Sequence, residues 1–533
     1  MRGEGWGGHE GVPGSLADAS TIRSSLRDNW PALIAGPAAL LLYGFTLAPG
    51  LTWAHHGSDG GDFLAAALVR GIPHPSGYPT YVLLLRALTA IVPGDPARTG
   101  NWLSAICAAL GISVFAFLAN RMLAATAWRG LVALSAALCL GASPALWGQA
   151  TITEVHGLNF LLVVSLMALL WLWMRTPSRW WPPLAGLVFG LSLGNHLTTL
   201  LLIPAAADWL WHNRRSLSDR THGWLAVAAA ILGLSVYLYL PLAAAKDPPA
   251  NWGDPQTPQR FLEVVSVQVY RPLVFGVALS AIPGRLAAWG NELARQFGGG
   301  LWGALIAVLG AWLLDRRDHL WWRFTLLVVI AYSLYAIGYD TADSHLYLIP
   351  VWAAAALWLA EGLNWLAQWM ADWLAREKNA RKRSLSGVLF LLTLIALPVA
   401  AVWRHGPTLE ALRDTRATDF LEAALTEADQ NAVIFVEEDA RTFALWYGIY
   451  GLQRRSDLTP VNLRLYAFPW YRRILASHHP QVLPPESVDA MDANSFVAEL
   501  AGRLPVYRAG SIEAGLTGLA EQRAGALVKL TPQ

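Results

Sequence analysis

The segment WAHHGSDGGDFL holds two carboxylates with a spacing that suits acid–base chemistry. Asp59 and Asp62 stand three residues apart beside a short apolar stretch, so a helix would place both side chains on one face. An aspartate at a helix start ordinarily accepts hydrogen bonds from free backbone N–H groups. A pair on one face can also hold one cation, or set a general base beside an orienting partner. We therefore treat Asp59 and Asp62 as candidate catalytic residues.

A second motif, HPSGYP, follows at residues 74–79. Its prolines and glycine fix a sharp backbone path. His74 and Tyr78 add side chains that can hydrogen-bond a substrate, and His74 is the member suited to a phosphate. A rigid turn is an equally good explanation for the prolines and the glycine.

Later segments place more polar and aromatic side chains near the ends of apolar runs. Ionisable groups at membrane depth cost several kcal/mol unless they are paired or hydrated, so they favour a water-filled cavity. The candidate substrate-binding residues are Tyr78, Glu154, His156, Asn195, Trp252, Tyr270, Asp340, Asp343 and Tyr347. Glu154 is also open to interpretation as half of a structural ion pair.

Arg271 is the candidate for holding a phosphate group. It follows Tyr270 in the segment FLEVVSVQVYRP, and a guanidinium near the headgroup level can bind two phosphate oxygens at once. We expect His74 and His196 to assist it. The sequence shows no Gly-rich nucleotide loop, no metal-spaced His/Cys cluster and no Ser-His-Asp order, so a nucleotide-using site is not supported.

The composition places these residues in a membrane protein. Of the 533 residues, 55% are hydrophobic and only 14% are charged, against about 25% charged in soluble proteins. Apolar runs near the length needed to cross a bilayer, about 20 residues, recur along the chain. This excludes a soluble enzyme and predicts an α-helical multi-pass membrane protein in contact with lipid. The net charge of +2 indicates no nucleic-acid partner.

The basic residues between the runs predict the topology. The run at 77–93 is short and carries Arg86, so we assign it to an outer loop. The short gaps that hold Lys and Arg then fall on the cytoplasmic side, and the short gaps around 149–154, 196–198 and 339–345 hold neither. The positive-inside rule therefore predicts about eleven crossings and a cytoplasmic N-terminus. A bacterial inner or plasma membrane is the expected location.

The chain divides by composition into three parts. Residues 1–29 read as a disordered cytoplasmic tail, and residues 30–404 as the membrane domain with long outer loops at 50–98 and 245–298. Residues 405–533 are predicted to form a small extracytoplasmic α/β domain. In that domain, Glu437, Glu438 and Asp439 follow a predicted strand. We interpret them as a solvated strand end, with acceptor contact as the alternative.

Several motifs in order resemble the membrane family designated domain-of-unknown-function family 2723. Its eukaryotic relatives include a protein O-mannosyltransferase, and it belongs with the C-type glycosyltransferase superfamily (GT-C). The motifs are DGGD at 59–62, HPSGYP at 74–79, EVHGLN at 154–159, GNH at 194–196, NWGDPQT at 251–257 and GYDTADSHLYLIP at 338–350. They span about residues 45–350. Asp62 stands where the family usually has Glu, and Ser76 where it commonly has Pro.

The resemblance implies a GT-C-like fold and an enzyme that transfers a sugar from a polyprenyl-phosphate donor to an extracytoplasmic protein, lipid or glycan. In that interpretation Asp59 is the general base, with Asp62 as its partner or as an acceptor ligand. Arg271 holds the leaving phosphate, helped by His74 and His196. No cofactor is certain, although a divalent cation at Asp59 and Asp62 is possible.

Two other functions fit a multi-pass protein with polar outer ends. A lipid-linked sugar flippase or transporter would show internal symmetry and polar residues at mid-membrane depth. A non-catalytic scaffold would need far fewer crossings. Because the polar residues of this chain collect near the outer helix ends and no repeat is present in the sequence, we favour the transferase.

Overall fold

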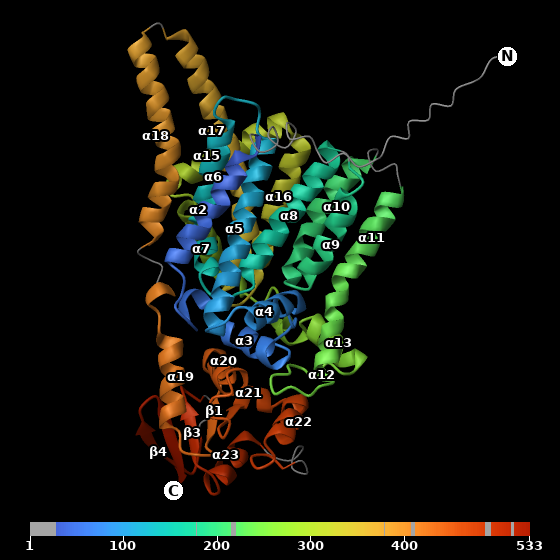
Figure 1. The fold of residues 1–533 in the computed structure, drawn as a ribbon, viewed down its shortest axis with the longest axis vertical. Helices are drawn as coiled ribbons and strands as arrows, with labels where there is room; N and C mark the ends of the chain where they lie inside the picture. The colour runs from blue at the N-terminus through green and yellow to red at the C-terminus, as the bar shows by residue number, and fades with distance from the viewer. Residues whose placement is uncertain are drawn as a thin grey trace, which may run out of the picture.

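The computed structural model describes residues 28–176, 178–214, 220–377, 379–406, 411–484, 492–512 and 516–533. All but the last two residues of the expected tail at 1–29 lie outside the described residues. The chain forms an elongated molecule with a helical bundle at one end and a sheet with its helices at the other (Figure 1). We call the described part of 411–533 the sheet unit.

The bundle consists of helices that run along the long axis (Figure 1), apart from the short α7 (Pro144–Ala150), which is bent by 66° from α6 (Arg129–Gly141). They are α2 (Trp30–Phe45), α5 (Pro96–Met122), α6 (Arg129–Gly141), α7 (Pro144–Ala150), α8 (His156–Arg175), α9 (Trp181–Leu193), α10 (Ile203–His212), α11 (Arg220–Leu234), α15 (Leu301–Arg317), α16 (His319–Gly338), α17 (Ile349–Arg376) and α18 (Ala380–His405). Within the described ranges, six helices are long and apolar enough to cross a membrane, or seven if the bent pair α6–α7 counts as one. The shorter α2 and α9 are also apolar, and the expected count of about eleven crossings stays a prediction.

Capping residues in the sequence set where several bundle helices begin. The side chain of Asp95 accepts a hydrogen bond from the N–H of Ala97 at the start of α5, where Pro96 occupies the first helical position. Asp318 likewise accepts from the N–H of Trp321 at the start of α16. Both arrangements satisfy backbone donors that a helix leaves free at its N-terminus.

The two long loops fold into short helices between the bundle and the sheet unit (Figure 1). The first loop holds η1 (Ala54–His56), α3 (Gly60–Val69) and α4 (Pro79–Ile91). The second region holds α12 (Tyr239–Ala244), α13 (Pro258–Val265), η5 (Gln268–Leu273), η6 (Leu279–Ala281) and α14 (Ile282–Arg295). Two further short turns, η2 (Leu197–Leu202) and η7 (Ser344–Leu348), precede α10 and α17. The run assigned to an outer loop, 77–93, therefore forms the short helix α4.

The sheet unit is built on a mixed five-stranded sheet. Its strands are β1 (Val433–Val436), β2 (Thr459–Asn462), β3 (Val506–Ala509), β4 (Leu519–Ala524) and β5 (Leu527–Pro532), in the order β2-β1-β3-β5-β4. The helical segments between them are α19 (Arg416–Glu427), α20 (Asp439–Leu445), η10 (Trp446–Gly451), α21 (Leu463–Tyr466), α22 (Pro469–His478) and α23 (Ala493–Ala501). β1 is parallel to β2 and β3, and all four of its residues are buried, as in a strand covered on both faces.

The sheet unit and the first outer loop share one hydrophobic core. Phe63 and Leu64 of α3 pack in the same cluster as Phe420 of α19 and Ile434 of β1. At Gly61 a Cβ atom would lie 2.5 Å from the carbonyl oxygen of Phe443, so α3 and α20 approach as closely as only a glycine permits. This shared core fixes α20 against the loop that carries Asp59 and Asp62.

Hydrogen bonds reinforce the same junction. One carboxylate oxygen of Asp414 accepts hydrogen bonds from the Thr52 hydroxyl at 2.6 Å and from the backbone N–H groups of Trp53 and Ala54 at 2.9 and 2.8 Å. The Tyr447 hydroxyl donates to the Asp95 carboxylate at 2.9 Å. The first loop is therefore held by groups from the far end of the sequence.

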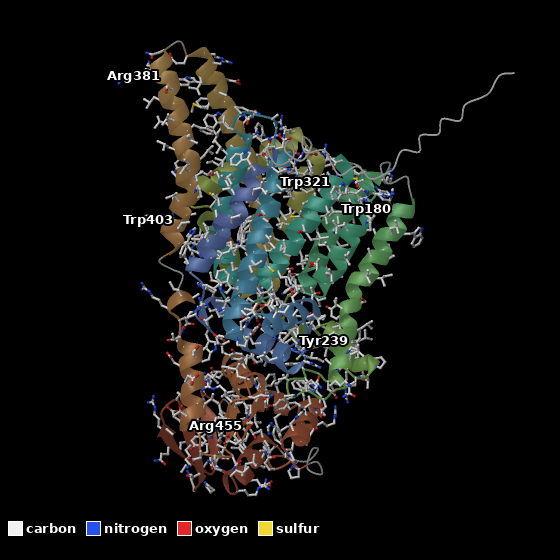
Figure 2. All side chains as sticks on the ribbon, in the orientation of Figure 1. Trp180, Tyr239, Trp321, Arg381, Trp403 and Arg455 are labelled. Carbon is white, nitrogen blue, oxygen red and sulfur yellow. The ribbon has the colours of Figure 1, made fainter. Side chains whose placement is uncertain are left out.

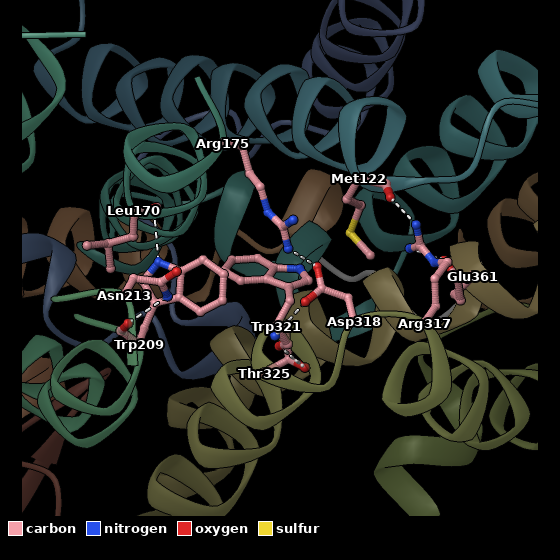
Figure 3. A network of polar contacts seen from close by, with 10 residues as sticks. All are labelled: Met122, Leu170, Arg175, Trp209, Asn213, Arg317, Asp318, Trp321, Thr325 and Glu361. Carbon is pink, nitrogen blue, oxygen red and sulfur yellow. Dashed lines mark hydrogen bonds and ion pairs between the residues drawn. The ribbon is translucent and has the colours of Figure 1, made fainter. Parts of the chain in front are cut away.

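The opposite end of the bundle carries a set of matched charges (Figure 3). Figure 3 shows Arg175 paired with Asp318 and Arg317 paired with Glu361. Arg323 pairs with Asp208, and we call these six residues the distal network. Basic side chains mark both ends of the molecule, since Arg381 lies at the tip of α18 and Arg455 lies in the sheet unit (Figure 2).

Candidate active site

A cavity of about 850 Å³ opens where the first loop, η2, η5, η7 and α20 meet. We call it the outer cavity. Ten of the residues predicted from sequence line it: Asp59, His74, Tyr78, Glu154, His156, His196, Tyr270, Arg271, Asp343 and Tyr347. Residues from motifs nearly 300 positions apart, such as Asp59 and Tyr347, thus meet in one space.

A histidine links the two aspartates of the first loop. The wholly buried Asp62 accepts, through one oxygen, both the backbone N–H of His74 and its ring Nδ1, each at 2.8 Å. The other ring nitrogen, Nε2, lies 3.5 Å from the carboxylate of Asp59. Asp59 itself is partly exposed to the cavity and accepts a hydrogen bond from the Ser58 hydroxyl at 3.0 Å. The order Asp62–His74–Asp59 therefore runs from the core to the cavity.

The two carboxylates keep His74 protonated. Burial opposes a charge on the ring, but the negative charges of Asp59 and Asp62 together raise the pKa of His74 to about 9. At neutral pH the imidazolium holds the Asp59 carboxylate in place from one side. Both ring nitrogens of His74 thus face carboxylates, which differs from the expectation that this residue meets a phosphate.

His196 enters the cavity as a neutral donor. Burial and the neighbouring histidines His156 and His74 lower its pKa to about 3. Its Nδ1 accepts a hydrogen bond from the backbone N–H of Thr198 at 3.3 Å, so the proton of the neutral ring sits on Nε2. The ring packs against Tyr78 and Tyr347, with centroids 6.1 and 5.6 Å away. This geometry leaves one N–H for a ligand in the cavity.

Arg271 supplies the permanent positive charge of the cavity. It lies on the 3-10 helix η5 next to Tyr270, and its side chain is exposed. Within the described ranges, this guanidinium makes no ion pair or side-chain hydrogen bond. A planar cation with free donors is suited to bind an oxyanion in two places.

Two further carboxylates, Glu154 and Asp343, line the cavity. The backbone of Glu154 is held by the Ser104 hydroxyl of α5, which donates to its carbonyl oxygen at 3.0 Å. Burial and the charge of Asp59 hold the pKa of Glu154 well above its usual value. Asp343 precedes η7. Because the carboxyl group of Glu154 keeps its proton to a higher pH than an ordinary glutamate, it can donate a hydrogen bond as well as accept one.

Four predicted site residues do not line the cavity. Asp62 is buried behind His74, and Asn195 is buried with its amide donating to the Val155 carbonyl oxygen at 3.3 Å. Trp252 packs in the core against the rings of Phe443, Trp446 and Trp470. Asp340 is exposed and lies 3.5 Å from Arg285, whose guanidinium also donates to the Ser344 hydroxyl. These residues support the site from outside it.

The most informative residue missed as a site residue is Asp439. It lines the cavity from α20, together with Ala440 and Phe443. The interpretation as a solvated strand end holds only in part: Glu437 is buried, whereas Asp439 is exposed and faces the cavity. The available signal was its position at the carboxyl end of a parallel strand, where open α/β sheets place ligand-binding residues. Other lining residues not singled out beforehand are Trp53, His56, Ser58, Thr198, Tyr335, Tyr339 and Thr341.

The arrangement of Asp59 and Asp62 does not fit a shared cation. His74 lies between the two carboxylates, and one oxygen of Asp62 already accepts two hydrogen bonds from His74. Elsewhere in the described part of the chain, no group of three or more His, Cys, Asp or Glu side chains is placed to hold a metal ion. Instead, the two carboxylates flank the protonated ring of His74, and Asp59 also faces the cavity.

The chain is similar in sequence to two named protein O-mannosyl-transferases. Residues 59–219 match the model of the protein O-mannosyl-transferase TMEM260 N-terminal domain, beginning at Asp59. The mouse protein O-mannosyl-transferase TMEM260 is 26% identical over 493 residues, which cover 87% of this chain and 67% of the mouse protein. The Dictyostelium discoideum protein of the same name is 24% identical over 324 residues, covering 55% of this chain and 38% of its own length.

Solved structures show the same fold at low sequence identity. ArnT from Cupriavidus metallidurans, bound to undecaprenyl phosphate, matches with a TM-score of 0.59 at 14% identity, covering 93% of this chain and 97% of ArnT. The Archaeoglobus fulgidus oligosaccharyltransferase tethered to an acceptor peptide matches with a TM-score of 0.53 at 13% identity, covering 92% and 70%. Both are multi-pass membrane enzymes of the C-type glycosyltransferase class. The motifs and these relatives together support a membrane glycosyltransferase that has the fold of the C-type enzymes and is similar to the protein O-mannosyl-transferases.

Proposed function

We propose that the protein transfers a sugar from a polyprenyl-phosphate donor to a hydroxyl group of an extracytoplasmic acceptor in the outer cavity. The observation that carries the proposal is the pairing, in one cavity, of the partly exposed carboxylate Asp59 with the unpartnered guanidinium Arg271. A transferase of this kind needs a base for the acceptor and a cation for the leaving phosphate. The lipid phosphate in the ArnT structure and the peptide in the archaeal structure support these two substrate classes.

In the proposed reaction, Asp59 accepts the proton of the acceptor hydroxyl as its oxygen attacks the anomeric carbon. The bond between that carbon and the phosphate oxygen breaks, and the lipid phosphate leaves with the bonding electrons. Arg271 stabilises its negative charge, and the N–H of His196 is placed to assist. A single displacement of this kind inverts the anomeric configuration.

The relatives guide the choice of substrates for a first assay. Because they are named protein O-mannosyl-transferases, polyprenyl-phosphate mannose and a peptide containing Ser and Thr come first, with other lipid-linked sugars and glycan acceptors beside them. The purified full chain in lipid should form a glycosylated product. Asp59→Asn should lower turnover by about 100-fold or more while it still binds the donor, because general base catalysis contributes on that scale.

A matched variant separates the loss of a catalytic group from a general effect of replacing an aspartate by asparagine. Asp419→Asn replaces an exposed aspartate of α19 that does not line the cavity, and it should transfer sugar like the wild type. Wild-type protein that binds donor and glycosylates no acceptor in the panel would contradict the transferase and favour a flippase. Full activity of Asp59→Asn would reject Asp59 as the base.

The proposed reaction also sets an orientation in the membrane. We infer that the sheet unit and the outer cavity face the extracytoplasmic side, because the Arg- and Lys-rich tip between α17 and α18 lies at the opposite end (Figure 2). After replacement of the buried Cys107 and Cys139, Arg523→Cys should react with an impermeant thiol reagent added to intact cells, and Arg381→Cys should not. The reverse pattern would overturn the orientation.

A further inference from the structure

The sheet unit forms one wall of the outer cavity. One face of α20 presents Asp439, Ala440 and Phe443 to the space. The opposite face is turned to the sheet, where the Thr442 hydroxyl accepts a hydrogen bond from the Asn462 amide at 2.8 Å. The position of Asp439 is therefore a property of the fold of the sheet unit.

The wall is fixed firmly in place. Gly61 of α3 lies directly against the backbone of Phe443, and the ring of Phe443 stacks on His74 with centroids 6.1 Å apart. Arg441, which pairs with Glu438, also lies over the ring of Trp53 at 5.9 Å. Asp439 is thus held at a set distance from the first loop, and its carboxylate remains accessible from the cavity.

The electrostatic surroundings of Asp439 select what it can bind. Burial and the charge of Asp59 raise the pKa of Asp439 to about 6, and Asp62 acts in the same direction. His74 and Arg464 lower it. At neutral pH the carboxylate is ionised and lies beside other carboxylates, so an anionic group is repelled there. A neutral group with an N–H or O–H donor satisfies it.

We propose that Asp439 binds the acceptor, by accepting a hydrogen bond from an uncharged N–H or O–H group next to the reacting hydroxyl. This inference rests on the proposed transferase function and adds to it an acceptor subsite supplied by the sheet unit. The donor is held at the Arg271 side of the cavity, and the acceptor lies between Asp59 and Asp439. An acceptor carrying a phosphate or carboxylate next to its reacting hydroxyl is excluded by the same charges.

The test is the effect of Asp439→Asn on the two substrates measured separately. With a Ser/Thr peptide that the wild type glycosylates, the acceptor KM should rise about tenfold, because a hydrogen bond to a charged group contributes on that scale. The donor KM should change less than about twofold, since Asp439 does not contact the donor. Asp439→Glu should recover part of the acceptor affinity, and Asp419→Asn should behave as wild type because Asp419 is exposed and does not line the cavity.

A second variant keeps the proposal testable if the first one misfolds. Ala440→Leu adds bulk to the same wall without changing a charge, and it should also raise the acceptor KM more than the donor KM. In the wild type the acceptor KM should rise as the pH falls through about 6, and in Asp439→Asn that rise should be absent. An acceptor KM within twofold of wild type in Asp439→Asn would overturn the proposal. A wild type without any transfer would instead reject the transferase function itself.

Discussion

The two ends of the membrane bundle use the same residue types in opposite ways. In the distal network each arginine is matched by a carboxylate, as Arg317 is by Glu361 at 2.7 Å (Figure 3). In the outer cavity the charges are matched only in part: Asp59 lies 3.5 Å from the His74 ring, whereas Asp343, Asp439 and Arg271 line the space without an ion pair to any described residue. Matched charges lock helices together, whereas unmatched charges in a cavity are available to a ligand.

The distal network also satisfies the backbone at helix ends. Arg317 donates to the carbonyl oxygen of Met122, the last residue of α5, at 2.7 Å, while it pairs with Glu361 of α17. The indole of Trp209 donates to the Leu170 carbonyl oxygen at 3.1 Å (Figure 3). These bonds tie α5, α8, α10, α15 and α17 together, so we expect mutations here to affect stability and those in the cavity to affect catalysis.

The largest effect on catalysis beyond the base itself should come from Asp62→Asn. The variant removes the charge that holds His74 from the core side, and without it the ring loses part of its hold on Asp59. Turnover should fall by about 30- to 100-fold, on the scale of misplaced acid–base groups. Donor and acceptor KM should change little. A turnover within threefold of wild type would show that the buried aspartate serves only the fold.

The effect of pH on turnover should show whether the charged His74 in the outer cavity is needed for catalysis. Because Asp59 and Asp62 raise the pKa of His74 to about 9, the imidazolium is present below that pH and is lost as the pH rises through it. Turnover should therefore decline above about pH 9. In Asp62→Asn the decline should begin at lower pH, because one of the charges that raise the pKa is gone. An unchanged alkaline limit in the variant would mean that another group sets it.

Arg271→Ala should affect the donor alone. Loss of the cation that faces the leaving phosphate should raise the donor KM by about tenfold, with a smaller rise for Arg271→Lys, which keeps the charge and loses the planar fork. Acceptor KM serves as the internal control. Equal losses for both substrates would indicate that Arg271 shapes the cavity and does not bind the phosphate.

Glu361→Gln tests whether the distal network contributes to stability and not to catalysis. The variant breaks a matched pair in which the carboxylate is nearly buried and the guanidinium is one-third exposed. We expect the melting temperature in detergent to fall by about 2 °C, because a partly exposed pair contributes about 1 kcal/mol. Both KM values should stay at wild-type levels. A specific rise in either KM would show that the two ends are coupled.

The smallest effect should come from chelation. His74 occupies the space between Asp59 and Asp62 with two close contacts to the carboxylates, so EDTA should change the transfer rate by less than about twofold. Restoration of lost activity by a specific divalent cation would contradict this arrangement.

The sequence predicted the parts of the site that depend on residue type, and it missed those that depend on packing. Asp59 and Arg271 line the cavity as expected. The spacing of Asp59 and Asp62 could not show which one faces solvent, because the contact of α3 with Phe443 sets the rotation of that helix. Asp340 and Asp343 have the same spacing, yet Asp340 pairs with Arg285 outside the cavity.

The fold shows a similar division. Apolar runs predict helices well, since hydrophobicity alone decides that a segment enters lipid. The shared core that contains Phe63 and Ile434 was not predictable, because these residues lie far apart in the chain. The hydrophobic pattern of each segment predicts its own helix or strand and does not indicate which segment it packs against.

The bonds of Asp414 to Thr52, Trp53 and Ala54 have a consequence for biosynthesis. The segment with Asp59 emerges from the ribosome early, but the groups that clamp it and the wall that carries Asp439 are made only after the last bundle helix. In a nascent chain the segment with Asp59 therefore lies in an unfinished cavity until the sheet unit has folded against the first loop.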